Sequence, residues 1–139
     1  MNAKYLLDTN IVSEPLRPKP NPKILERLKW HQDELAIASV VWHELWFGCY
    51  RLPVSAKRTA IEKYLNEVIA ISIPILAYDE HAAEWHAAER ARLTGLGKTP
   101  PFVDGQILAI AKTNELILIT LNPSDYASFE GAKVEDWSR

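Results

Sequence analysis

The feature that most constrains the fold is a short apolar run near the start of the chain that gives way at once to polar residues. Tyr5-Leu6-Leu7 is followed directly by Asp8-Thr9-Asn10, which carry a carboxylate, a hydroxyl and an amide. Buried parallel strands are typically short apolar runs bounded by turn residues, so residues 4–7 are predicted to form a central strand. Ligands of open α/β sheets gather outside the carboxyl ends of the strands, where Asp8 would lie. The same polar residues also fit a simpler role, in which they cap and turn the chain into the next helix.

Strand and helix patterns alternate along the rest of the chain. Further strands are predicted at residues 35–38, 73–76, 116–120 and 133–135, with Pro74 favouring a sheet edge for the third. Helices are predicted to start after Asn21, Ser39, Ser55 and Asp79, and at Phe102. This alternation predicts an α/β fold of three layers, α/β/α, around a central, mostly parallel sheet of four to five strands. We expect residues 1–139 to form one domain.

Composition narrows the class of protein. The chain is 47% hydrophobic and 24% charged, as in ordinary soluble globular proteins, and its net charge of −2 argues against a broadly basic nucleic-acid binder. Cys49 is the only cysteine, which fits a reducing compartment. No apolar run approaches the roughly 20 residues that cross a bilayer. We therefore expect a cytoplasmic protein without a membrane association.

Asp104 is the most informative residue after Asp8. At about 100° per residue it shares one helical stripe with Ile107, Leu108 and Ala111, close to the start of a predicted helix. A carboxylate on an inward stripe needs a partner, because unpaired buried charge is costly. Metal binding or catalysis would supply one, and helix capping is the alternative. Gly105 beside it would let another backbone or a substrate come close.

Two further acids have weaker local support. Asp125 follows the strand at 116–120, and Thr120 and Asn122 are near enough to orient a ligand or a water there; an Asx turn is the alternative. Glu44 lies away from the apolar stripe of its predicted helix, so a solvated face is the simple interpretation. Glu44 becomes a site residue only if that face borders the cleft beyond the strands.

Together these acids predict a metal site. Two carboxylates about 4 Å apart repel by roughly 4 kcal/mol at an effective dielectric constant of 20, so a cluster must retain protons or bind a divalent cation. A set of oxygen ligands without paired His or Cys favours Mg²⁺ or Mn²⁺ over zinc. Because Mg²⁺ sites are often completed by phosphate, the pattern indicates phosphoester chemistry.

These acids lie in segments that resemble the PIN domains, and in particular the VapC-type toxins of bacterial toxin–antitoxin pairs. The segments, in order, are Leu7-Asp8-Thr9-Asn10, Val41-Trp42-His43-Glu44-Leu45, Phe102-Val103-Asp104-Gly105 and Thr120-Leu121-Asn122-Pro123-Ser124-Asp125-Tyr126. The opening from Asp8 to Arg17 is similar to one branch of that group. Leu121 departs from the pattern, since many relatives carry a basic residue there.

The resemblance implies a metal-dependent ribonuclease with a PIN-like fold. The catalytic acids it implies are Asp8, Glu44, Asp104 and Asp125. The supporting residues it implies are Thr9, Asn10, Thr120 and Asn122. Mg²⁺, with Mn²⁺ as a substitute, would be held chiefly by Asp8 and Asp104, and either Asn122 or Asp125 would contact the metal at the last turn. The expected reaction is hydrolysis of RNA phosphodiester bonds.

The resemblance also implies partners: an RNA substrate, a cognate antitoxin that covers the acidic cleft, and a homodimer or higher oligomer. Phe47 and Tyr50, which leave the apolar stripe of their helix, would suit such a protein surface. Two basic groups are candidates for RNA phosphate contacts, or are simply solvated: Arg17, Lys19 and Lys23, and Arg90, Arg92 and Lys98. Two other functions stay open, a catalytically inactive PIN-fold RNA-binding or interaction module and another Mg²⁺-dependent phosphohydrolase.

Overall fold

The computed structural model describes residues 2–139 and contains a five-stranded sheet in which every pairing is parallel. The strand order is β3-β2-β1-β4-β5, so the strand formed by the opening apolar run is the middle one. The strands are β1 (Tyr5–Leu7), β2 (Leu35–Ala38), β3 (Ile75–Leu76), β4 (Ile117–Ile119) and β5 (Val134–Glu135). The register sets Leu7 opposite Ile37 on β2 and Ile119 on β4. The predicted α/β fold with a central parallel sheet is confirmed.

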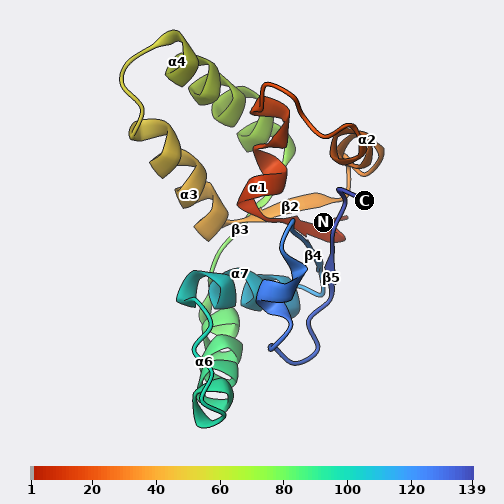
Figure 1. The fold of residues 1–139 in the computed structure, drawn as a ribbon, viewed down its shortest axis with the longest axis vertical. Helices are drawn as coiled ribbons and strands as arrows, with labels where there is room; N and C mark the ends of the chain where they lie inside the picture. Colours follow the sequence, from red (N-terminus) through yellow and green to blue (C-terminus); the bar gives the residue numbers. More distant parts are fainter. Residues whose placement is uncertain (1) are drawn as a thin grey trace.

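Helices cover both sides of the sheet (Figure 1). The helices before β3 are α1 (Thr9–Val12), α2 (Pro22–Trp30), α3 (Ser39–Tyr50), α4 (Ala56–Lys63) and α5 (Ala70–Ser72), with a 3₁₀ turn η1 (Glu14–Leu16) and a π-helical segment η2 (Tyr64–Ile69). After β3 come α6 (Glu80–Gly95), α7 (Phe102–Thr113) and the 3₁₀ turn η3 (Pro123–Tyr126). In Figure 1, α4 and α6 lie at opposite ends of the long axis, with the sheet between them.

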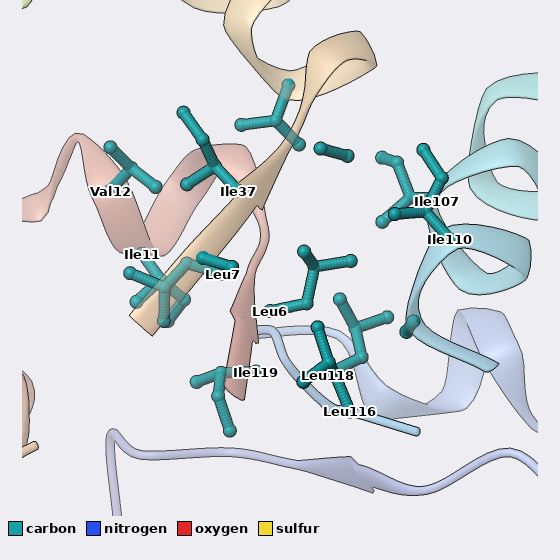
Figure 2. Packing of buried hydrophobic residues seen from close by; sticks show 14 of the residues in the cluster. Leu6, Leu7, Ile11, Val12, Ile37, Ile107, Ile110, Leu116, Leu118 and Ile119 are labelled. Atoms are coloured by element: carbon teal, nitrogen blue, oxygen red, sulfur yellow. The ribbon is translucent and has the colours of Figure 1, made fainter. Parts of the chain in front are cut away.

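The core forms on both faces of the central strands because their side chains alternate. Figure 2 shows Leu6 and Leu118 on the side of α7, and Leu7 and Ile119 on the side of α1. All four are almost completely buried. Burial of a side chain of this size contributes about 1.5–3 kcal/mol, so the short strands are held mainly by packing. Their position fixes where β1 and β4 end, and therefore where the polar residues after them lie.

Most of the predicted boundaries are confirmed. Asn21, Ser55 and Asp79 cap their helices through side-chain oxygens, and β3, which follows Pro74, is an edge strand. The prediction for Ser39 was wrong, because α3 begins at Ser39 itself and Ala38, still extended, occupies the cap position. β2 therefore passes into α3 without a loop, which no cap pattern signals. Within residues 2–139, none of the helices is both long enough and apolar enough to cross a membrane.

Candidate active site

Asp8 lies at the carboxyl end of the central strand and caps α1. Its Oδ1 accepts a hydrogen bond of 2.8 Å from the backbone N–H of Thr9, and its own N–H donates to the carbonyl of Ile119 at 2.9 Å. The second bond joins the ends of β1 and β4. Asp8 thus performs the capping role that was one of its two interpretations, but this uses only one of its carboxylate oxygens.

The other oxygen of Asp8 is held by two hydroxyl groups from the segment after β4. Thr120 Oγ1 donates to Oδ2 at 2.9 Å and Tyr126 Oη donates to it at 3.1 Å. Both residues are buried. A carboxylate has about four lone-pair positions, so these three hydrogen bonds leave Asp8 one position for a further ligand.

Tyr126 is a site residue that the sequence analysis missed. Burial raises the pKa of its phenol, and the negative charges of Asp8, Asp104 and Asp125 raise it further, so the hydroxyl stays protonated and available as a donor. Tyr126 ends η3, one residue after Asp125. No periodic pattern covers this short turn, and the only sequence signal was its position at the end of the segment that resembles PIN domains.

Asp104 comes to this site from the first turn of α7. Burial raises the pKa of its carboxyl group, and the charges of Asp8 and Asp125 raise it further. Among residues 2–139 no donor forms a hydrogen bond with its side chain. Asp104 is therefore a partly buried carboxylate that faces two others and lacks a compensating partner in the described chain. The alternative interpretation also holds in part, because Asp104 lies in the first turn of α7, where a negative charge is favoured, although the cap position itself is Pro101.

Asp125 lies in η3 with its side chain exposed, beyond the end of β4. Its N–H donates to the carbonyl of Asn122 at 3.1 Å, and the N–H of Asn122 donates to Thr120 Oγ1 at 3.2 Å. The backbone of Asn122 therefore helps to orient the hydroxyl that holds Asp8. The Asn122 side chain is exposed, and Leu121 packs against the core.

The remaining predicted site residues make fewer contacts with Asp8 and the segment after β4. Thr9 contributes its backbone N–H to Asp8, and Asn10 is exposed on α1. Glu44 is half-buried on α3, which starts at the end of β2 and contacts both α1 and α7. No hydrogen bond or ion pair joins Glu44 to the three aspartates in the part of the chain that is described. Its catalytic role stays a prediction.

The donor set suits a hard divalent cation. Its ligands are carboxylate oxygens with nearby hydroxyl groups, and the mutual repulsion of Asp8, Asp104 and Asp125 is what a bound cation would relieve. Among residues 2–139, no group of three or more His, Cys, Asp or Glu side chains is placed so that it could hold a metal ion. The fit therefore rests on Asp8 and Asp104, with the other ligand positions left to water and phosphate, as Mg²⁺ prefers.

Helix α6 supports the two segments that bring Asp104 and Asp125 to the site. His86 is buried against Gly105, where a Cβ atom would overlap the imidazole, and its Nδ1 lies 2.9 Å from the Tyr78 hydroxyl. The close approach at Gly105 is thus made by a histidine side chain, and not by the backbone or substrate that we expected there. Glu89 pairs with Arg92 through two hydrogen bonds of 2.8 and 2.9 Å.

The Glu89–Arg92 pair holds the chain just after η3. Glu89 accepts from the N–H of Glu130 at 2.7 Å, and Arg92 donates to the Ser128 carbonyl at 3.0 Å. Arg92 is therefore committed to this structural role, and Arg17 is similarly paired with buried Glu14 at 3.4 Å. Arg92 is thus used within the fold, whereas the Arg17 side chain is 62% exposed and makes only this one polar contact within the described part of the chain.

Comparison with known proteins links this arrangement to a family. The PIN domain model matches residues 5–127. The chain is 31% identical to the "tRNA(fMet)-specific endonuclease VapC" of Shigella flexneri, over 97% of this chain and 98% of that protein. It is 30% identical to "Toxin FitB" of Neisseria gonorrhoeae, over 95% of this chain and 97% of that protein.

Solved structures give the same result. A crystal structure of FitAcB from Neisseria gonorrhoeae superposes with a TM-score of 0.84 at 30% identity, covering 94% of this chain and 95% of that one. DNA-bound VapBC from Salmonella typhimurium gives a TM-score of 0.82 at 26% identity, covering 97% and 98%. The similarity in sequence and in fold therefore runs over nearly the whole length of both chains.

Proposed function

Because this chain belongs to the PIN-domain family, we propose that it is a metal-dependent endoribonuclease toxin of the VapC type, inhibited by a cognate antitoxin. The observation that carries the proposal is the Asp8 carboxylate at the carboxyl end of β1, which Thr120 and Tyr126 hold from the segment after β4, with the charges of Asp8 and Asp125 raising the pKa of the partly buried Asp104. Full-length relatives named as ribonucleases and toxins support it. Such a site, with oxygen ligands and unrelieved negative charge, is suited to phosphodiester chemistry.

Asp8 and Asp104 would hold Mg²⁺, or Mn²⁺ in its place. When bound, such an ion polarises the phosphodiester and lowers the pKa of a coordinated water. Thr120, Tyr126 and the Thr9 N–H fix the Asp8 carboxylate, so that its remaining lone-pair position keeps one direction. The hydroxyls donate to Asp8 and therefore favour its ionised form as a ligand.

Hydrolysis would then proceed by addition of a water oxygen to phosphorus and loss of the 3′ oxygen, leaving a 5′-phosphate and a 3′-hydroxyl. We assign to Asp125 the role of orienting that water and accepting its proton, because its carboxylate is exposed beside Asp104. Glu44 would complete the site from α3, and Asn10 and Asn122 would contact the substrate or its water through their exposed amides.

The test is cleavage of labelled single-stranded RNA by the purified protein in Mg²⁺, in Mn²⁺ and in EDTA. We expect cleavage only with a divalent ion, and losses of about 10²–10³-fold in kcat for Asp8→Asn and Asp104→Asn, the range seen when a transition-state contact is removed. Asp33→Asn is the matched control, because this exposed carboxylate precedes β2 at the opposite edge of the sheet.

Each rival function predicts a different result. Undiminished cleavage by both site variants, or cleavage in EDTA, would contradict the proposed mechanism. RNA binding without cleavage under all three conditions would indicate an inactive binding module. Hydrolysis of p-nitrophenyl phosphate with intact RNA would indicate another phosphohydrolase.

The partner we propose is a protein antitoxin that places an arginine between Asp8 and Asp104, since a guanidinium pairs well with carboxylates. A structure of this fold from Klebsiella pneumoniae is a toxin–antitoxin complex, which supports the proposal. Expression of the chain alone in the bacterial cytoplasm should arrest growth, and Asp104→Asn should not. If Asp104→Asn arrests growth as strongly as the wild type, the toxicity does not depend on this site.

We further propose that the chain forms a homodimer or higher oligomer through the exposed aromatic side chains on α3. Phe47 is 50% exposed and Tyr50 is 60% exposed. Apolar patches of this kind on a helix are typical of protein interfaces. Sedimentation of the wild type and of the Phe47→Asp/Tyr50→Asp variant tests this: the variant should be smaller, and equal masses would exclude this surface.

A further inference from the structure

An exposed aromatic ring lies in the first turn of α7, the same turn that carries Asp104. Phe102 begins α7, two residues before Asp104, and 49% of it is exposed to solvent. The guanidinium carbon of Arg90, from α6, lies 5.1 Å from the centre of the Phe102 ring. Arg90 is exposed and forms no ion pair with an acid of the described residues, unlike Arg92 on the same helix.

The Phe102 ring is held in place from the protein side. The His86 imidazole packs against it with ring centres 4.8 Å apart. His86 is buried, and its ring is fixed by the Tyr78 hydroxyl and by close packing on Gly105. Phe102 is therefore an ordered ring on the helix that carries Asp104, and binding to it would need little reorganisation.

We propose that the Phe102–Arg90 pair is a stacking subsite for one base of single-stranded RNA, next to the phosphodiester that is cleaved. This inference rests on the proposed ribonuclease function. Unpaired bases stack on aromatic rings and on guanidinium planes, and every base offers such a face. The bases of a duplex are already stacked, so the subsite selects single-stranded segments without selecting their sequence.

The charge of the protein favours such a contact. The chain as a whole carries a net charge of −2, and without a bound cation Asp8, Asp104 and Asp125 repel the phosphates of RNA. A contact to a base adds affinity that does not depend on the phosphates. Because Phe102 and Asp104 share the first turn of α7, a base held at Phe102 would lie within one helical turn of the acid.

Binding is measured by fluorescence anisotropy in an Asp8→Asn background, which slows cleavage. The ligands are a 12-nucleotide single-stranded RNA and a series that carries one abasic residue at each position. We expect Phe102→Ala and Phe102→Leu each to raise Kd by about 5- to 150-fold, the cost of losing one stacked base. Phe102→Tyr should retain affinity. Arg90→Gln should weaken binding more than Arg90→Lys.

The abasic series identifies stacking itself. One abasic position should weaken binding to the parent protein but not to Phe102→Leu, because the two changes remove the same contact. In cleavage assays with the native acids, the Phe102→Leu defect should appear in KM rather than in kcat. Trp30→Ala is the control, since this exposed aromatic ends α2 at the opposite edge of the sheet.

Several results would overturn the subsite. One is a Phe102→Leu variant that binds RNA with wild-type affinity. Another is an abasic series in which the parent protein and Phe102→Leu lose the same affinity at every position. Either result would leave the nuclease proposal intact. A protein that neither binds nor cleaves RNA would overturn both proposals. Phe102→Leu keeps apolar bulk, and melting followed by circular dichroism shows whether a loss of binding in this variant reflects unfolding. If Phe102→Leu is unfolded and Phe102→Tyr also fails to bind RNA, the result counts against the subsite.

Discussion

Thr120 and Asp8 are 112 positions apart in the chain, yet the Thr120 hydroxyl donates to the Asp8 carboxylate at 2.9 Å. Thr120 is fully buried, immediately after β4, and Asp8 follows β1. Because the two strands are adjacent and parallel, their carboxyl ends meet at one edge of the sheet. The orientation of the central acid is thus set by a neighbour that only strand pairing supplies.

Removal of this hydroxyl should weaken both the fold and the site. Thr120→Val keeps the shape but deletes a hydrogen bond to a charged group, which is worth about 1.5–3 kcal/mol. We expect urea unfolding to show a loss in that range and RNA cleavage to fall about tenfold in kcat. In an Asp8→Asn background the same change should cost less, because the two residues share one interaction. Strict additivity would show that Thr120 acts on something else.

Gly105 and Gly48 should respond to alanine in opposite directions. In a helix interior Gly→Ala normally stabilises by about 0.5–1 kcal/mol, and nothing lies within 4 Å of the Cβ position at Gly48. At Gly105 the new methyl would overlap the buried His86 ring, so we expect a loss of about 1–3 kcal/mol. Chemical denaturation measures both. A smaller loss for Gly105→Ala in a His86→Ala background would identify the clash as the cause.

The Glu89–Arg92 pair should make stability depend on pH. The hydrogen bonds from Arg92, together with that from the Glu130 N–H, lower the pKa of Glu89 below its usual 4.5 despite its burial. A lowered carboxyl pKa contributes stability above about pH 4.5 that is lost as the pH falls through the folded-state value. Glu89→Gln should therefore cost about 1.5–3 kcal/mol at pH 7, and this cost should shrink steadily as the pH falls below 4.5.

Glu84→Gln is the control for that experiment, because Glu84 is an exposed carboxylate on the same helix. Its unfolding free energy should follow that of the wild type at every pH. A Glu89→Gln deficit that is the same at pH 3 and pH 7 would attribute the effect to packing rather than to the charge.

Asp104→Asn should stabilise the metal-free protein at neutral pH. The wild-type carboxylate is partly buried beside two like charges, and the amide removes that repulsion. We expect a rise in Tm of about 2–4 °C in EDTA, the shift that roughly 1 kcal/mol produces in a domain of this size. Mn²⁺ should then raise the Tm of the wild type but not of the variant. Equal responses to Mn²⁺ would place the ion elsewhere.

The local pattern of the sequence was sufficient for most of the architecture. Apolar runs such as Leu6-Leu7 and cap residues such as Asn21 and Asp79 act within a few positions, so the strands, most helix starts and the α/β class were predicted. The start of α3 was missed because β2 passes into it without a loop. The pattern also marked Asp8, Asp104 and Asp125 as acids that follow strands or open a helix.

Only the tertiary structure decided how these acids are held. Tyr126, in η3, donates a hydrogen bond to Asp8, and His86, on α6, packs against Gly105 on α7. Neither contact is signalled by a periodic pattern in the sequence. Periodicity reports which side of its own element a residue faces, whereas the pairing of β1 with β4 and the packing of α6 on α7 decide which residues meet. The roles of Glu44, Asn10 and Asn122 stay predictions for that reason, since their partners come with substrate, metal or antitoxin.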